Sequence, residues 1–120
     1  MKIQFLAVFL ILICTTACFE PDRFCEKYKT GTFTFEYDIN GEKKQSTFTR
    51  NDTLSIEYYD QKVDTAKVRW LNDCEFVLYP YDKKTPIHYK ILTTTSNSYT
   101  FEYNVIGKKN KSKGIALKTN

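Results

Sequence analysis

Four cysteines and a single histidine are the residues of this 120-residue chain whose types suit covalent, metal-binding or acid–base chemistry. His88 is the only imidazole available for proton transfer near neutral pH. It stands between Ile87 and Tyr89, with no serine or cysteine nearby in the sequence for it to activate. We therefore expect His88 to be a surface-facing or hydrogen-bonded strand residue, and we expect no enzyme activity, metal site or cofactor.

Cys18 follows a segment that has the composition of an export signal. Lys2 supplies a positive charge, and residues 5–13 are all apolar. This run is too short for the roughly 20 residues that a membrane-spanning helix needs, and it is typical of a signal-peptide core. Residues 15–17 place small side chains before Cys18, similar to the lipobox of bacterial lipoproteins, although leucine is more usual at the first of these positions.

We therefore predict that residues 1–17 are a lipoprotein signal peptide and that Cys18 carries the lipid. The alternative is an ordinary secretory signal cut nearby, which would leave Cys18 as a thiol or a disulfide partner. Two or three acyl chains would anchor the protein permanently, because each buried methylene contributes roughly 0.8 kcal/mol. Phe19 follows the cysteine instead of an aspartate, so we expect the outer membrane of a bacterial envelope.

Cys25 and Cys74 remain once Cys14 leaves with the signal and Cys18 takes the lipid. Two cysteines in an exported domain are expected to pair, because the compartment is oxidising. Metal ligation is the rival interpretation, and it lacks both a paired cysteine motif and a second histidine. We therefore predict a Cys25–Cys74 disulfide.

The remaining chain has the length of one domain, and its composition favours β-structure. Nine tyrosines, nine phenylalanines and many threonines suit pleated, half-buried strands. The formal net charge of +4 is mild and contains no long block of like charges, so we expect a monomer that does not bind nucleic acid. We expect residues 18–29 to form a lipid-anchored tether with a short helical turn, and residues 30–120 to form the folded domain.

Alternating apolar and polar residues recur along this domain, separated by turns every eight to twelve residues. Phe33, Phe35, Tyr37 and Ile39 share one face, and Asn40-Gly41 then gives a strong hairpin signal. The pattern predicts an all-β fold of about eight antiparallel strands, arranged as a meander that forms a small lipocalin-like barrel or a curled sheet. We expect strand 42–50 to be an edge or largely solvated strand, and Leu54, Ile56 and Tyr58 to face inward.

Several segments together resemble a family of proteins. They are Cys25 ahead of KTGTF at residues 29–33, RWLNDCEF at 69–76, KILTT at 90–94 and SYTFE at 98–102. The chain is similar in these segments to small envelope lipoproteins of the Bacteroidota, in particular of flavobacteria. The resemblance implies a lipocalin-like barrel and no established activity. Some similar chains carry the label DNA topoisomerase IV, which we consider wrong because this sequence has no phosphate-binding glycine loop, no room for several domains, and an export signal.

A lipocalin-like cup would place aromatic side chains around a ligand. Trp70 is expected in the core of such a barrel, and it could instead line a cavity together with Phe33, Tyr58, Phe76 and Phe101. A filled interior would favour an interaction module, whereas an empty or water-lined cup would favour a carrier.

Surface features suggest two further sites. Lysines crowd three regions: Lys108, Lys109, Lys111 and Lys113; Lys43 and Lys44; and Lys83 and Lys84. They suit solvated loop tips that protect strand edges, or alternatively a patch for anionic lipid, glycan or an acidic partner. Asp52-Thr53 and Asp64-Thr65 match a short pattern for O-glycosylation in exported Bacteroidota proteins.

The sequence thus predicts a non-catalytic, lipid-anchored envelope protein with a binding or structural role. Its expected partners are the membrane through the lipid, and an envelope protein, a glycan or a small hydrophobic ligand. A lipocalin-like carrier of a small hydrophobic molecule is the alternative.

Overall fold

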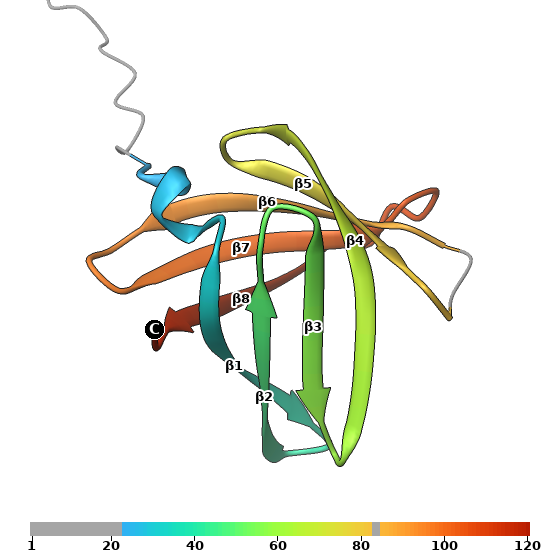
Figure 1. Cartoon of the computed structure of the whole chain (residues 1–120). Helices are drawn as coiled ribbons and strands as arrows, with labels where there is room; N and C mark the ends of the chain where they lie inside the picture. Colours follow the sequence, from blue (N-terminus) through green and yellow to red (C-terminus); the bar gives the residue numbers. More distant parts are fainter. Residues whose placement is uncertain (1–22, 83–84) are drawn as a thin grey trace, which may run out of the picture.

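Eight antiparallel strands form a closed barrel in the computed structural model, which describes residues 23–82 and 85–120 (Figure 1). The strands are β1 (Gly31–Ile39), β2 (Glu42–Arg50), β3 (Leu54–Tyr59), β4 (Lys62–Asn72), β5 (Glu75–Pro80), β6 (Ile87–Thr94), β7 (Ser98–Val105) and β8 (Ser112–Lys118). One short 3₁₀ helix, η3 (Cys25–Tyr28), precedes them. The predicted all-β meander with a short N-terminal helical turn is confirmed. The predicted signal peptide, Cys18 and Lys83-Lys84 lie outside the described residues.

Each strand pairs with the next along the chain, and β1 pairs with β8 to close the barrel. Figure 1 shows β1–β4 upright, with β5–β8 running across them. The first hairpin turns at Asn40-Gly41, where both residues have positive φ (52° and 83°), as the sequence predicts. The closing seam is short, since only Phe33–Phe35 pair with residues 116–118.

Helix η3 lies across one end of the barrel, and hydrogen bonds to the end of β6 and to the end of β8 hold it there. The Tyr28 hydroxyl donates to the carbonyl of Thr95 at 2.6 Å, and the Phe24 backbone N–H donates to the Thr94 hydroxyl at 3.0 Å. The Lys118 ammonium donates to the carbonyl of Lys27 at 2.7 Å. The end of the barrel that η3 covers is therefore closed by the chain itself.

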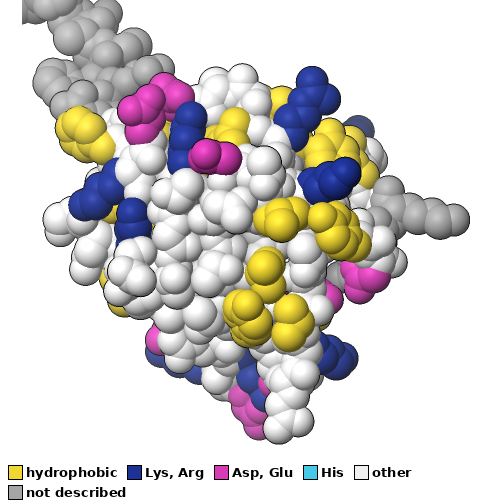
Figure 2. All heavy atoms as spheres, in the orientation of Figure 1, with side chains coloured by type: hydrophobic (Ala, Val, Ile, Leu, Met, Phe, Trp, Pro, Cys, Tyr) yellow, Lys and Arg dark blue, Asp and Glu magenta, His cyan; other side chains and the backbone are white. Residues whose placement is uncertain are grey.

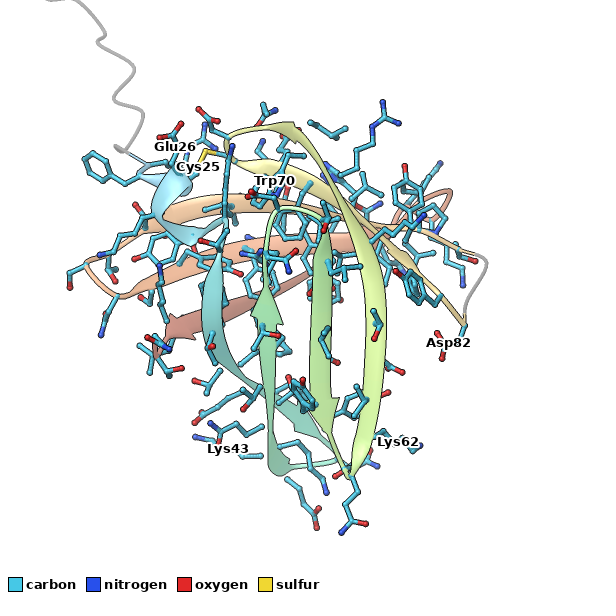
Figure 3. The ribbon with its side chains drawn as sticks, in the orientation of Figure 1. Cys25, Glu26, Lys43, Lys62, Trp70 and Asp82 are labelled. Atoms are coloured by element: carbon cyan, nitrogen blue, oxygen red, sulfur yellow. A yellow bond between two sulfur atoms is a disulfide. The ribbon has the colours of Figure 1, made fainter. Side chains whose placement is uncertain are left out.

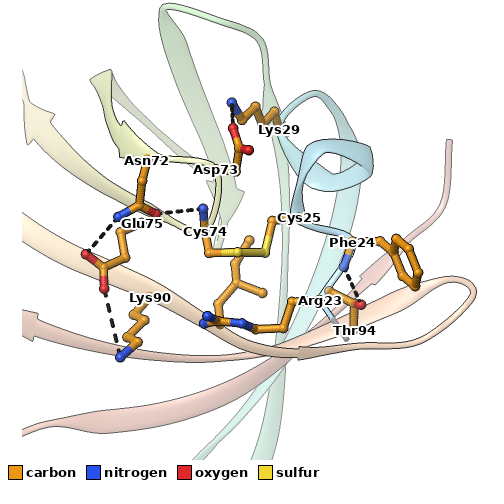
Figure 4. The surroundings of a disulfide bond; sticks show 11 residues. Arg23, Phe24, Cys25, Lys29, Asn72, Asp73, Cys74, Glu75, Lys90 and Thr94 are labelled. Carbon is orange, nitrogen blue, oxygen red and sulfur yellow. Dashed lines mark hydrogen bonds and ion pairs between the residues drawn. A yellow bond between two sulfur atoms is a disulfide. The ribbon is translucent and has the colours of Figure 1, made fainter. Parts of the chain in front are cut away.

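The predicted disulfide joins η3 to the turn between β4 and β5. Cys25 and Cys74 are bonded, with a sequence separation of 49 and 5.2 Å between their Cα atoms (Figure 4). Around this bridge, Lys29 pairs with Asp73 at 3.0 Å, and Arg23 donates to the carbonyl of Ile91 at 3.1 Å. The bridge thus fixes the cover of the closed end to the barrel wall.

Two expectations about individual strands are wrong. Strand β2 was expected to be an edge or solvated strand, but it pairs with both β1 and β3. Its residues Ser46, Phe48 and Arg50 are buried. The polar sequence suggested a solvent-exposed strand, yet Thr47–Arg50 are paired on both sides, and every second residue from Ser46 to Arg50 turns inward.

Strand β3 presents the opposite face to the one expected. Ser55, Glu57 and Tyr59 face the interior, whereas Tyr58 is 45% exposed on the outside. On the outside, exposed Tyr58 of β3 pairs with exposed Val63 of β4. Figure 2 shows apolar side chains gathered over these two strands. The expectation failed because it assumed that the interior of the barrel is filled by apolar side chains.

Removing the disulfide should destabilise the barrel substantially. Replacing Cys25 and Cys74 together by alanine frees a loop of about 50 residues in the unfolded chain, which corresponds to about 4 kcal/mol in the chain-entropy account. Chemical denaturation of the mature domain, compared with the double variant, measures this difference. Equal free energies of unfolding would contradict the assignment of the bridge as a main support of the closed end.

Candidate functional site

The barrel encloses a cup-shaped cavity of about 520 Å³. Its lining is mostly aromatic, with four polar or charged side chains; it comprises Phe35, Tyr37, Ser46, Phe48, Arg50, Ser55, Glu57, Tyr59, Leu78, Tyr89, Tyr99, Phe101 and Tyr103. Figure 3 places Cys25 and Trp70 at the closed end of the barrel, and Lys43 and Lys62 at the opposite end. Tyr37 and Tyr59 line the cavity near that opposite end, where the β1–β2 and β3–β4 turns lie.

Arg50 forms the floor of this cavity. Its side chain is only 4% exposed, and its Nε donates to the carbonyl of Lys29 at 3.1 Å. One terminal nitrogen also donates to the carbonyl of Tyr28, and both terminal nitrogens lie 3.3 Å from the Tyr99 hydroxyl. The guanidinium therefore ties the segment after η3 to β7 from inside the barrel.

Aromatic rings surround the same guanidinium. Its central carbon lies 4.6 Å from the ring centroid of Phe76, 4.9 Å from that of Phe33 and 5.5 Å from that of Phe48. Trp70 and Tyr99 complete the set at 5.6 and 5.8 Å. A buried cation loses its hydration, and cation–π contacts together with hydrogen bonds donated by every guanidinium nitrogen offset that loss. Arg50 therefore closes this end of the cavity.

One wall of the cavity contains Tyr89 and Tyr103, which continue a stack of aromatic rings that starts at Phe76, outside the cavity lining. Phe76, Tyr89 and Tyr103 lie on neighbouring strands, with Phe76 and Tyr89 at 5.0 Å and 1° between their ring planes. Tyr89 and Tyr103 continue the stack at 5.4 Å and 17°. Phe101 packs against both Tyr89 and Tyr103 at about 6 Å. Such parallel faces are suited to contact with a flat apolar group.

The wall formed by β2 and β3 is polar. The Ser46 hydroxyl is buried and has no hydrogen-bond partner in the described part of the chain. The Tyr59 hydroxyl donates to Asp64 at 2.8 Å, and this bond raises the pKa of Tyr59 to about 12. Across the cavity, burial raises the pKa of Tyr89, and the negative charge of Glu57 adds to the rise. The cavity is therefore amphipathic.

The five aromatic residues proposed from sequence for a cavity do not lie together around it. Phe101 lines the cavity. Phe33, Phe76 and Trp70 lie below it and pack against Arg50. Tyr58 is on the outer surface of β3, so its proposed role in the cavity is wrong. Sequence reasoning missed Ser46, Arg50 and Ser55, which alternate inward but are residue types usually found at the surface.

His88 lies on the outer face of β6. Its Nε2 is 3.7 Å from a carboxylate oxygen of Glu75, which also contacts Lys90 at 3.9 Å and Asn72 at 3.4 Å. Within residues 23–82 and 85–120, no three histidine, cysteine or acidic side chains group in a way that could hold a metal ion.

The other surface features are separate from the cavity. Lys111 contacts Glu102 at 3.5 Å, whereas Lys108 and Lys109 are exposed in the β7–β8 loop. Thr53 lies in an exposed turn where its hydroxyl contacts Asn51 at 3.2 Å, and Thr65 is half-buried on β4. These positions do not test whether the lysines form a binding patch or whether the two threonines are glycosylated, so both hypotheses stay predictions.

Comparison with known proteins returned no likeness: no family model, no curated protein and no solved structure matches the chain. In the part of the chain that the structure describes, no helix is both long enough and apolar enough to cross a membrane. The resemblance to flavobacterial lipoproteins therefore stays a prediction.

Replacing Ser46 by alanine should leave the stability of the empty barrel unchanged or raise it by up to about 1 kcal/mol, because the hydroxyl has no partner to lose. Ser98 is the matched control, since its hydroxyl contacts that of Thr95 at 2.6 Å. Ser98→Ala should cost about 1 kcal/mol. Urea denaturation measures both variants. If Ser46→Ala lowered the free energy of unfolding as much as Ser98→Ala does, the Ser46 hydroxyl would have a hydrogen-bond partner, which would contradict the unsatisfied polar wall.

Proposed function

We propose that this protein is a non-catalytic, lipid-anchored envelope protein that binds a small amphipathic molecule inside its barrel. The observation that carries the proposal is the cavity itself, about 520 Å³ in volume and lined by side chains from six of the eight strands. A volume of this order lies within the range of small-molecule sites in proteins. A role as a purely structural module would not need an interior of this kind.

The construction of the two ends supports binding. The end covered by η3 is sealed by Arg50 and the disulfide. A rigid floor holds the cavity walls in place without a ligand, so the protein loses little conformational entropy when a ligand binds. Among the described residues, the opposite end carries the β1–β2 and β3–β4 turns and the β7–β8 loop, and the cavity reaches it at Tyr37 and Tyr59. A ligand would therefore enter from that end.

The predicted anchor fits this arrangement. Lipid on Cys18 would lie five residues before Arg23, and five residues span at most about 17 Å even when fully extended. The closed end would therefore stay near the membrane surface, and the open end would face away from it. Such a protein would receive its ligand from the aqueous space or from another envelope component.

Fluorescence titration with phenylnaphthylamine, a neutral aromatic dye, tests the proposal. The mature domain should bind one dye per chain in a saturable way. Leu78→Trp adds a ring to the cavity lining and should weaken binding about tenfold or more. Tyr79→Trp is the matched control, because Tyr79 is the next residue and is 39% exposed on the outside.

Thermal melting of both variants should show that each one folds. Absence of saturable binding to the wild-type domain would contradict the proposal. Equal binding to Leu78→Trp and Tyr79→Trp would also contradict it, because the dye would then occupy the outer surface.

A further inference from the structure

The cavity lining favours rings over flexible chains. Eight of its thirteen lining residues are aromatic, and Leu78 is the only aliphatic one. The Tyr89–Tyr103 pair presents nearly parallel ring faces, with 17° between the planes. Flat groups gain from offset contact with such faces, whereas an acyl chain needs no particular ring orientation.

At the floor, the Tyr99 hydroxyl is held as a hydrogen-bond donor. Both terminal nitrogens of Arg50 donate to the Tyr99 oxygen at 3.3 Å. A phenol has one proton to donate, and the described residues show no acceptor for it. Tyr99 lines the cavity and is 3% exposed. The free proton is therefore available to a group inside the cup.

The charge of Arg50 strengthens this donor. Its hydrogen-bond acceptors are two backbone carbonyls and the Tyr99 hydroxyl, all of which are neutral. A cation that bonds the phenol oxygen withdraws electron density from it, so the O–H becomes a stronger donor to an acceptor. Ser46 lies on β2, the strand that carries Arg50, and its hydroxyl is buried and has no hydrogen-bond partner among the described residues. This hydroxyl is a second polar group of the lining to which a ligand could bond.

We infer that the cavity binds a ring compound carrying a hydrogen-bond-accepting oxygen, with this oxygen on Tyr99 at the floor and the ring against the aromatic wall. This inference rests on the proposed function and adds the chemical class of the ligand. Arg50 acts as a positioning residue, because it reaches the ligand through Tyr99.

Two dyes with nearly the same aromatic skeleton test the inference. Anilinonaphthalene sulfonate carries a group of accepting oxygens, and phenylnaphthylamine lacks it. Wild-type protein should bind the sulfonate about tenfold more tightly than the neutral dye. Tyr99→Phe removes the donor and keeps the ring, so it should abolish the preference. Tyr58→Phe removes an exposed hydroxyl and should change neither affinity.

The outcomes separate the two proposals. Failure of both dyes to bind overturns the proposed function together with the inference. Equal affinities of wild-type protein for the two dyes overturn the inference alone, even if Tyr99→Phe does not fold. A preference that survives in Tyr99→Phe shows that the sulfonate is bound elsewhere, and it also overturns the inference. Displacement of the bound sulfonate dye by dodecanoate at equal concentration would contradict the ring selectivity.

Discussion

The burial of one positive charge is the constraint on which the closed end of this barrel depends. Arg50 is only 4% exposed, so its charge has to be stabilised mainly by the protein. Carbonyls of Tyr28 and Lys29, the Tyr99 hydroxyl and five aromatic rings supply that stabilisation. These groups come from the N-terminal segment and from strands on both sides of the barrel. Satisfying one side chain thereby fixes how η3, β2 and β7 meet.

The disulfide and Arg50 fix the same end from outside and from inside. The Cys25–Cys74 bond holds η3 to the β4–β5 turn, and Arg50 holds the residue that ends η3 from within the barrel. The interior above Arg50 is a cavity lined by aromatic rings and hydroxyls. Because the closed end holds the barrel together, the interior toward the other end can stay open and amphipathic. The proposed binding function needs such an interior.

Local features of the fold were predictable from the sequence, and features set by closure were not. The Asn40-Gly41 hairpin follows from residues that tolerate positive φ, and the cysteine pairing follows from the oxidising compartment that the sequence predicts. Alternation correctly separates the two faces of β3, but it does not say which face is inside when the interior is an amphipathic cavity. The burial of Arg50 was missed because arginine is almost never fully buried. Its partners, Tyr28 and Tyr99, are also distant in sequence.

The free energy of unfolding of Arg50→Lys, compared with that of Arg69→Lys, tests the central role of Arg50 most directly. Lysine keeps the charge but cannot bond two carbonyls and a hydroxyl with the flat geometry of a guanidinium. The account predicts a loss of about 3 kcal/mol for Arg50→Lys and almost none for Arg69→Lys, since Arg69 is exposed on β4. Equal stability of the two variants would contradict the account, because the closed end would then not depend on Arg50.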